Sequence, residues 1–190
     1  MFQPEHLIQV PRWPEANDLD RIVRYWDKAG TEGSGAYTAG ALMAKRKSTK
    51  RTIILDVTRG QWGADKREQV IRYTAHQDVQ RLGVSPSKYA VRVEQEPGSG
   101  GKDSAMWTVR NTLAGFNAAA IRKTQSKENE WAPLASQVNT GGVEMVVGPW
   151  NQPMKQEMES APFGKYKDQL DALAGGFNYI WLGPSAGVIA

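Results

Sequence analysis

Acidic residues follow or open three separate apolar segments of the chain, and they are the residues best placed to do chemistry. They are Asp27 after IVRYW, Glu94 and Glu96 after YAVRV, and Asp168 and Asp171 at the start of DQLDALAGGF. Carboxylate oxygens are the ligands that hard divalent cations such as Mg²⁺ and Mn²⁺ prefer. Carboxylates delivered from separate elements to one place would therefore hold such an ion, which can activate water for attack on a phosphodiester.

Each acidic group also has an ordinary structural explanation. Asp27 could form a turn before Gly30, and Glu94 could be a polar strand end. Asp168 and Asp171 lie at i and i+3, so they share a helix face and could stabilise a helix N-terminus. Burial of an unpaired carboxylate after an apolar run is costly, however, so the three groups together favour ligands over packing choices.

A glycine-rich segment, EPGSGGKDS, follows the second acidic group and precedes a helical pattern. It departs from the nucleotide-binding loop at two positions, because Glu96 stands where the first glycine belongs and Asp103 follows Lys102 where Ser or Thr belongs. A nucleotide cofactor is therefore not expected. The segment predicts a tight turn into a helix N-terminus, which could also hold a DNA phosphate. Because Glu94 directly ends its apolar run, we favour it over Glu96 as a ligand.

The densest basic run lies between two expected strands. It consists of Lys45, Arg46, Lys47, Lys50 and Arg51. On a hairpin tip these side chains would present several cations to a DNA backbone. An exposed, solvated turn is the alternative reading of the same residues.

The elements that must position these side chains follow from hydrophobic periodicity. Strands are expected over 22–26, 37–43, 52–57, 89–93, 118–121 and 143–147, and helices over 64–82, 103–116, 131–138, 152–160 and 168–181. Short connections make the first three strands antiparallel, and a helical connection makes the fourth parallel to a neighbour. The order β-β-β-α-β-α-β followed by helices predicts an α/β fold of the ribonuclease-H-like type, a mixed sheet flanked by helices.

Length and composition limit the alternatives. A chain of 190 residues with 40% hydrophobic and 23% charged residues fits one domain with a real core, expected over residues 19–190 after a linker or lead-in over 1–18. The absence of cysteine excludes disulfides and Cys-based zinc sites, and two histidines argue against a His-rich zinc centre. The net charge of +4 is a mild bias towards polyanions. The sequence contains no apolar stretch long enough for a membrane span and no signal-peptide pattern, so we expect a soluble, intracellular protein.

From about Trp26 to Phe177 the chain resembles the C-terminal nuclease domain of the large terminase subunit of tailed bacteriophages. Five segments carry the resemblance in order: YWDKAGTEGSGAYTAG, ILDVTRGQW, VEQEPGSGGKDSA, ASQVNTGGVEMVVGPWN and DQLDALAGGFN. The string VEQEPGSGGKDS after a strand is the most specific of them. The resemblance implies a ribonuclease-H-like, divalent-metal-dependent endodeoxyribonuclease that cuts concatemeric viral DNA during genome packaging, in the cytoplasm of the infected bacterium.

The resemblance also implies a set of site residues and partners. Two Mg²⁺ or Mn²⁺ ions are expected, with Asp27 shared between them, Glu94 and Asp168 each completing one site, and Asp171 in support. Lys102 and Lys167 join the basic run as expected DNA contacts. The implied partners are double-stranded DNA, an N-terminal ATPase domain, the portal and the small terminase subunit, with no membrane. Because no Walker A pattern occurs, we expect the ATPase domain to lie outside this sequence.

Two departures from the family pattern keep other readings open. Many relatives have adjacent acids in the last motif, where this chain has Lys167, and many have Asp before the Tyr-Thr of the second strand, where this chain has Ala36. Both changes could weaken a second metal site. One alternative is another ribonuclease-H-like enzyme of the resolvase or transposase type. The other is a DNA-binding or docking module whose metal site is impaired.

Overall fold

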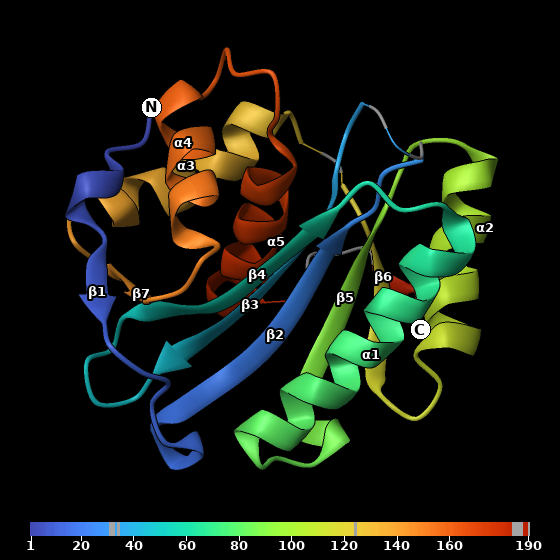
Figure 1. Cartoon of the computed structure of the whole chain (residues 1–190), viewed down its shortest axis with the longest axis horizontal. Coiled ribbons are helices and arrows are strands. Elements are labelled where there is room, and N and C mark those ends of the chain that lie inside the picture. Colours follow the sequence, from blue (N-terminus) through green and yellow to red (C-terminus); the bar gives the residue numbers. More distant parts are fainter. Residues whose placement is uncertain (31–32, 34, 124, 184–187, 190) are drawn as a thin grey trace.

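One mixed sheet runs through the centre of the molecule, with helices on both faces (Figure 1). The structure is a computed structural model that describes residues 1–190 except 31–32, 34, 124, 184–187 and 190, with the side chains of 188–189 also undescribed. The strands are β1 (Ile8–Val10), β2 (Leu19–Asp27), β3 (Thr38–Arg46), β4 (Thr52–Gly60), β5 (Tyr89–Gln95), β6 (Asn117–Arg122), β7 (Val143–Val146) and β8 (Val188–Ile189). The helices are α1 (Ala64–Leu82), α2 (Ser99–Trp107), α3 (Lys127–Asn139), α4 (Asn151–Ser160) and α5 (Asp168–Leu182).

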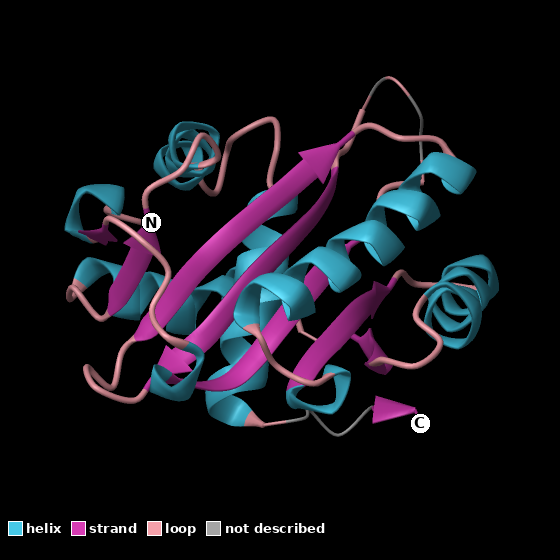
Figure 2. Cartoon of the chain, turned by 60° about the horizontal axis from the view of Figure 1, so that its bottom comes forward, coloured by secondary structure: helices cyan, strands magenta, loops and turns pink. Residues whose placement is uncertain are grey.

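The pairing of the strands confirms the predicted mixed sheet. The strand order is β1-β7-β4-β3-β2-β5-β6-β8. Strands β2, β3 and β4 pair antiparallel, whereas β5 pairs parallel with β2, β6 with β5 and β7 with β4. The helical crossover through α1 carries the chain from β4 to the far side of β2, as a parallel connection requires. Figure 2 shows the long strands side by side, with helices on either side of them.

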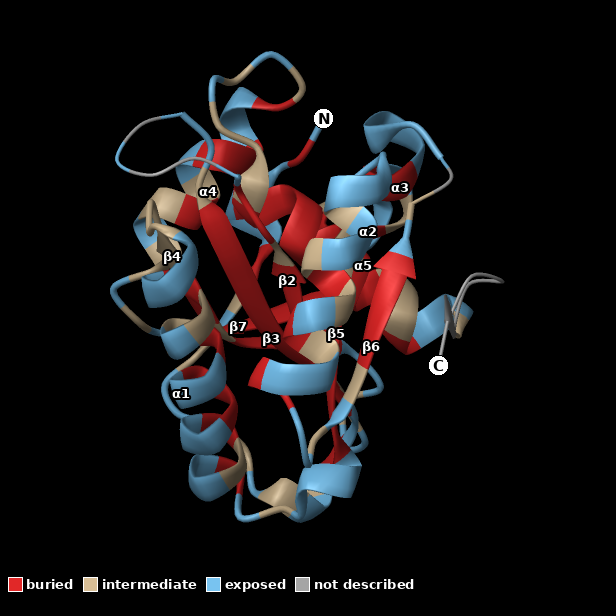
Figure 3. Cartoon of the chain, turned by 90° about the vertical axis from the view of Figure 1, so that its right-hand side faces the viewer, coloured by how far each residue is buried: buried red, intermediate tan, exposed pale blue. Residues whose placement is uncertain are grey.

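Two layers of helices bury the two faces of the sheet. Helices α3, α4 and α5 contribute to the apolar cluster on one face, and α1 and α2 to the cluster on the other. Alternation along β2 distributes its side chains between them: Val23 belongs to the first cluster, and Ile22 and Trp26 to the second. The buried residues of the strands and of α5 form a continuous interior (Figure 3). Asp27 therefore ends β2 on the face that α5 covers.

A glycine lets α5 lie close to the sheet. A Cβ atom at Gly175 would lie 2.3 Å from Cε1 of Tyr25, closer than any real contact allows. Gly175 stands one helical turn after Asp171 and on the same helix face. The close approach of α5 to β2 therefore directs Asp171 towards the strand end that carries Asp27.

A buried ionic cluster fastens β2 to α1 on the opposite face. Arg24 is 1% exposed; its Nε donates to Asp78 at 2.8 Å, and its Nη2 lies 2.7 Å from the other oxygen of Asp78 and 2.9 Å from Asp56. The hydroxyl of Tyr89 also donates to Asp78. Burial lowers the pKa of Arg24, but the charges of Asp78 and Asp56 outweigh burial and raise it overall. The two carboxylates neutralise the buried charge of Arg24, because an unpaired charge in the interior would strongly destabilise the fold.

The structure differs from the expected elements at several points, among them an earlier start of α3 and the additional strand β8. Within residues 1–18, β1 pairs with β7, and Phe2 and Leu7 belong to the core, although the prolines of this segment predicted an extended lead-in. Strand β3 continues through the first basic residues to Arg46. The helix expected over 103–116 is instead α2 followed by a π-helical segment, η4 (Thr108–Thr112), because its apolar residues fit both kinds of turn. No described helix is long and apolar enough to cross a lipid bilayer.

Candidate functional site

Asp27 and Glu94 end two neighbouring parallel strands. The register pairs Trp26 of β2 with Val93 of β5, so the next residues along both strands are Asp27 and Glu94. Adjacent strands lie about 4.8 Å apart, and alternation turns both side chains to the face covered by α3 and α5. Asp171 of α5 is 1% exposed and lies over the same end of the sheet. Three acidic residues from separate elements thus meet there.

The acidic residues perturb one another. Burial raises the pKa of Asp27 well above its usual range, and the negative charges of Glu94 and Asp171 raise it further. Burial also raises the pKa of Glu94, and although Lys123 opposes this, the pKa comes to about 7. Groups that repel one another in this way bind protons or cations to relieve the repulsion.

Two lysines that the sequence analysis missed lie among these carboxylates. Lys123 Nζ is 2.8 Å from Glu94 Oε2, 3.0 Å from Glu130 Oε2 and 3.7 Å from Asp171 Oδ1. Lys127, in the first turn of α3, donates a short hydrogen bond to Asp171 Oδ2. The ammonium groups therefore neutralise part of the carboxylate charge in the protein without a bound cation.

Helix α3 supplies further contacts to the site. The indole Nε1 of Trp131 donates to Asp171 Oδ1 at 2.8 Å, and Glu130 approaches Lys123 from the same helix. In the sequence, only the i and i+3 spacing of Lys127 and Glu130 indicated a shared helix face, and the helix was expected to begin later, at residue 131. Both residues therefore lay outside the expected helix.

Asp168, predicted as a main ligand, lies at the edge of the acidic group. Its Oδ2 accepts a hydrogen bond from the backbone N–H of Tyr37 at 3.0 Å. Burial raises the pKa of Asp168, the bond from Tyr37 lowers it, and the charge of Asp171 raises it again. Asp171, predicted as support, is the more deeply buried of the two acids and the one whose charge acts on both Asp27 and Glu94.

The other acidic and flanking residues lie outside this group. Glu96 and Ala36 are exposed, and Lys167 is partly buried at the N-cap of α5. The glycine-rich segment turns at Gly98, whose φ of 94° is one that glycine adopts without strain, and leads into α2 with Lys102 exposed in its first turn. The predicted tight turn into a helix is thus present.

The predicted basic hairpin lies at the other end of the sheet. Asp27 pairs with Ala39, whereas Leu19, at the start of β2, pairs with Arg46. The two ends of the sheet are separated by the length of β2. At the usual rise per residue this length is about 25 Å. Arg46 is also engaged by Asp18 and Glu144, both at 2.8 Å. The structure therefore does not bring the basic run and the acidic site together.

The donor set suits a hard divalent cation. Its oxygens belong to carboxylates, and two of them, Glu94 Oε2 and Glu130 Oε2, are buried facing the ammonium group of Lys123, in the place that a cation could take. Among the described residues no three acidic or histidine side chains converge tightly enough to form a finished metal cluster. Lys123 lies between Glu94 and Asp171 and bridges the two carboxylates in this arrangement.

Comparisons with known proteins agree with the fold. No protein-family profile and no curated protein matches the sequence. The manganese-soaked, inhibitor-bound nuclease domain of human cytomegalovirus terminase matches with a TM-score of 0.70 and 10% identity, over 95% of this chain and 94% of that one. The large terminase nuclease from thermophilic phage G20c with bound magnesium gives 0.59 and 12% identity, over 90% and 92%. The large terminase of a second thermophilic bacteriophage gives 0.63 and 13% identity, over 94% of this chain and 43% of that one.

These matches define the class of fold. The chain has the ribonuclease-H-like fold of terminase nuclease domains over nearly its whole length. The fold likeness confirms the architecture that the order of strands and helices predicted. At such low identity it does not transfer activity or residue roles.

Proposed function

We propose that the protein is a metal-dependent endodeoxyribonuclease of the terminase type, which cleaves double-stranded DNA during the packaging of a viral genome. The observation that supports this most is the meeting of Asp27, Glu94 and Asp171 on one face at one end of the sheet. The raised pKa values of Asp27 and Glu94 indicate a site that gains from binding a cation.

Three carboxylates would hold the metal in this proposal. Asp27, Glu94 and Asp171 form the inner group, because their charges act on one another, and Asp168 stands beside them at the rim. Bound Mg²⁺ or Mn²⁺ would supply an acidified water and stabilise the charge of the departing oxygen. Asp168 would join a second ion, as the resemblance implies, by turning away from the N–H of Tyr37.

The lysines and Trp131 act as positioning residues. Trp131 and Lys127 hold the two oxygens of Asp171 in fixed directions. Lys123 links Glu94 to Glu130 and Asp171, so it spaces the acids and offsets their repulsion. Neither lysine needs to transfer a proton for this role.

Assignment to the terminase type implies several partners. Double-stranded DNA is the substrate, and the ATPase domain that drives packaging would precede this domain in a longer chain. The portal and the small terminase subunit would bring the DNA, in the cytoplasm of the infected host. The large terminase of the second thermophilic bacteriophage, of which this chain matches 43%, supports a place within such a larger protein.

A DNA-binding module without cleavage is the second candidate. The observation that favours it is the pair of lysine ammonium groups among the acids. They already supply the positive charge that a bound metal ion would otherwise provide. Such a module would bind DNA in the presence or absence of Mn²⁺ and leave it intact.

Plasmid cleavage separates the two candidates. Supercoiled plasmid is incubated with the protein and Mn²⁺, Mg²⁺ or EDTA, beside Asp27→Asn and the matched control Asp20→Asn, an exposed acid near the other end of β2. We expect nicking and linearisation that need metal. This cleavage should be lost in Asp27→Asn and persist in Asp20→Asn. Full activity of Asp27→Asn would refute the site, and binding of DNA without cleavage under any metal would favour the module.

A further inference from the structure

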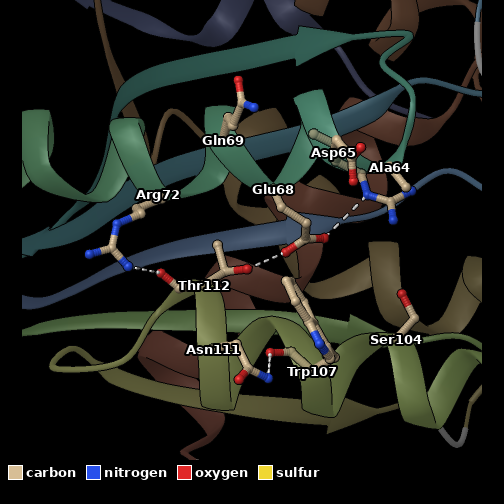
Figure 4. Close-up of a pocket in the computed structure, with 10 residues that line it drawn as sticks. Ala64, Asp65, Glu68, Gln69, Arg72, Ser104, Trp107, Asn111 and Thr112 are labelled. Carbon is tan, nitrogen blue, oxygen red and sulfur yellow. Dashed lines mark hydrogen bonds and ion pairs between the residues drawn. The ribbon is translucent and has the colours of Figure 1, made fainter.

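A cavity of about 610 Å³ lies between α1 and the end of α2, on the opposite face of the sheet from α5. Figure 4 shows it bounded above by Glu68 and Arg72 of α1 and below by Trp107, Asn111 and Thr112. Its volume falls within the range of pockets for small organic ligands. No residue of the proposed metal group lines it.

The wall of the cavity is rigidly built around Glu68. Thr108 and Thr112 donate to Glu68 Oε2 at 2.9 and 2.6 Å, and Lys28 Nζ lies 3.1 Å from Oε1. Both threonines belong to the π-helical segment η4, a type of irregularity that is frequent at functional sites. Burial raises the pKa of Glu68, but these hydrogen bonds and the charge of Lys28 outweigh it and keep the pKa below the usual value.

An aromatic ring stands open at this cavity. Trp107 is 55% exposed, which is unusual for so large an apolar side chain. Its indole rises from α2 towards α1 (Figure 4). Arg72 and Asn111 flank the indole. Arg72 donates a hydrogen bond to the backbone carbonyl of Thr112, and Asn111 donates one to that of Trp107, so both side chains are held in place. A flat ligand could stack on the ring and present its edge to these groups.

The charges that line the cavity cancel. Arg67 and Arg72 are balanced by Asp65 and Glu68. A bare phosphate would gain little from such a wall, whereas a neutral aromatic ring with donors and acceptors on its edge would fit. This balance of charges favours a base over the phosphate backbone.

A second cavity adjoins the first near the carboxyl end of β5. Its volume is about 240 Å³, its lining includes Glu94, and it shares Ala64, Arg67 and Ser104 with the first. The cavity beside Trp107 is therefore a close neighbour of the strand end that carries an acid of the proposed metal group.

We propose that the cavity between α1 and α2 binds one unpaired nucleobase of the DNA strand beside the cleavage site, stacked on Trp107. The proposal rests on the proposed function, since it extends the path of the same substrate. Stacking of a base on an aromatic side chain depends little on sequence, so the site would favour frayed, nicked or bulged DNA over fully paired DNA.

Photocrosslinking tests the contact directly. A duplex with one unpaired 5-iodouracil is bound in EDTA, so that it is not cut, then irradiated, and the cross-linked peptide is identified by mass spectrometry. A cross-link at Trp107 is expected, and it should weaken when the same base is paired. A cross-link only at other residues would overturn the proposal, and this experiment needs no variant to fold.

Affinity measurements test the energetics. Fluorescence anisotropy in EDTA compares duplexes with and without one unpaired base for the wild type, Trp107→Ala, Trp107→Phe and Tyr73→Ala. Tyr73 is the matched control, because it is 66% exposed on α1 and does not line the cavity. Loss of one stacked base should weaken binding of the unpaired substrate about 5- to 150-fold in Trp107→Ala. Trp107→Phe should retain most of the affinity, and Tyr73→Ala all of it.

The failures of the two proposals can be told apart. If the wild type cleaves plasmid with metal but Trp107→Ala keeps its preference for the unpaired base, only the base site is refuted, and a peptide segment becomes the better occupant. If the wild type neither binds nor cleaves any DNA, the proposed function fails and the base site with it.

Discussion

Lys123 places its ammonium nitrogen 2.8 Å from Glu94 Oε2, so a cation built into the chain occupies the acidic group. The same nitrogen is 3.0 Å from Glu130 Oε2. A bound divalent cation and Lys123 would therefore compete for the same negative charge, and the protein must exchange one arrangement for the other when metal binds.

Replacing Lys123 with Met tests this competition. Without the ammonium group the acids repel one another unopposed, so the metal-free variant should lose about 3–5 kcal/mol of stability, as when one partner of a buried ion pair is removed. Added Mn²⁺ should then raise its melting temperature more than that of the wild type. Calorimetric melting with and without Mn²⁺ measures both effects. Lys102→Met, on an exposed lysine, is the control, and an equal response to Mn²⁺ in both variants would contradict the competition.

Glu94 should make the metal-free protein less stable as the pH rises. Its pKa is raised from 4.5 to about 7, so between these values the folded state binds more protons than the unfolded state, and stability falls with increasing pH. The cost present above pH 7 is on the order of 3 kcal/mol, and it is absent below the unfolded pKa. The Glu94→Gln variant lacks this titration. The melting temperature of wild type minus variant, measured in EDTA from about pH 4 to 8, should therefore fall across this window. A flat difference would contradict the raised pKa.

Asp78 should be essential to stability although it lies on the face away from the acidic site. Asp78→Ala leaves Arg24 buried beside only Asp56, and should cost about 3–5 kcal/mol of unfolding free energy in urea titrations. The double variant Arg24→Met/Asp78→Leu should recover part of this loss, because no unpaired charge remains. Asp103→Ala, on an exposed residue, is the control. If the double variant were less stable than Asp78→Ala, the loss would come from packing.

Gly175→Ala should lower DNA cleavage by displacing α5, without removing any acidic residue. The new methyl would overlap the ring of Tyr25 and push α5 from the sheet, at a cost of about 1–3 kcal/mol. Asp171, one turn earlier, would move with the helix, so plasmid cleavage should fall even where the variant is fully folded. Gly100→Ala in α2, whose new Cβ would meet nothing within 4 Å, is the matched control. Equal cleavage by the two variants would contradict the idea that the packing of α5 against Tyr25 positions Asp171 for activity.

The sequence predicted the frame of the site better than its details. Asp27 and Glu94 could be found because each directly ends an apolar strand pattern, and parallel pairing then brings them together. From the sequence, Asp168 was expected in the main role and Asp171 in a supporting one. Local spacing could not test that order, since both acids lie on one helix face and the rotation of α5 depends on Gly175 against Tyr25. Their roles as ligands stay predictions.

The residues that the sequence could not reveal act across long separations in the chain. Lys123 reaches Asp171 only after α3 and α5 pack together, and the short polar connection before α3 gives no sign of this. The π-helical segment was equally hidden, because Val109 continues the apolar helical pattern of α2. Tertiary packing, rather than local preference, decides both features.

The parallel pairing of β2 with β5 has a consequence for when the proposed site can form. Asp27, Glu94 and Asp171 are far apart along the chain, and they meet only when the crossover through α1 is complete and α5 has docked. Contacts between residues so far apart in the sequence form slowly, because closing the long loops between them costs entropy before the contacts can stabilise the chain. A partly folded chain therefore has its acids scattered, and the ability to cut DNA would arise only with the last steps of folding.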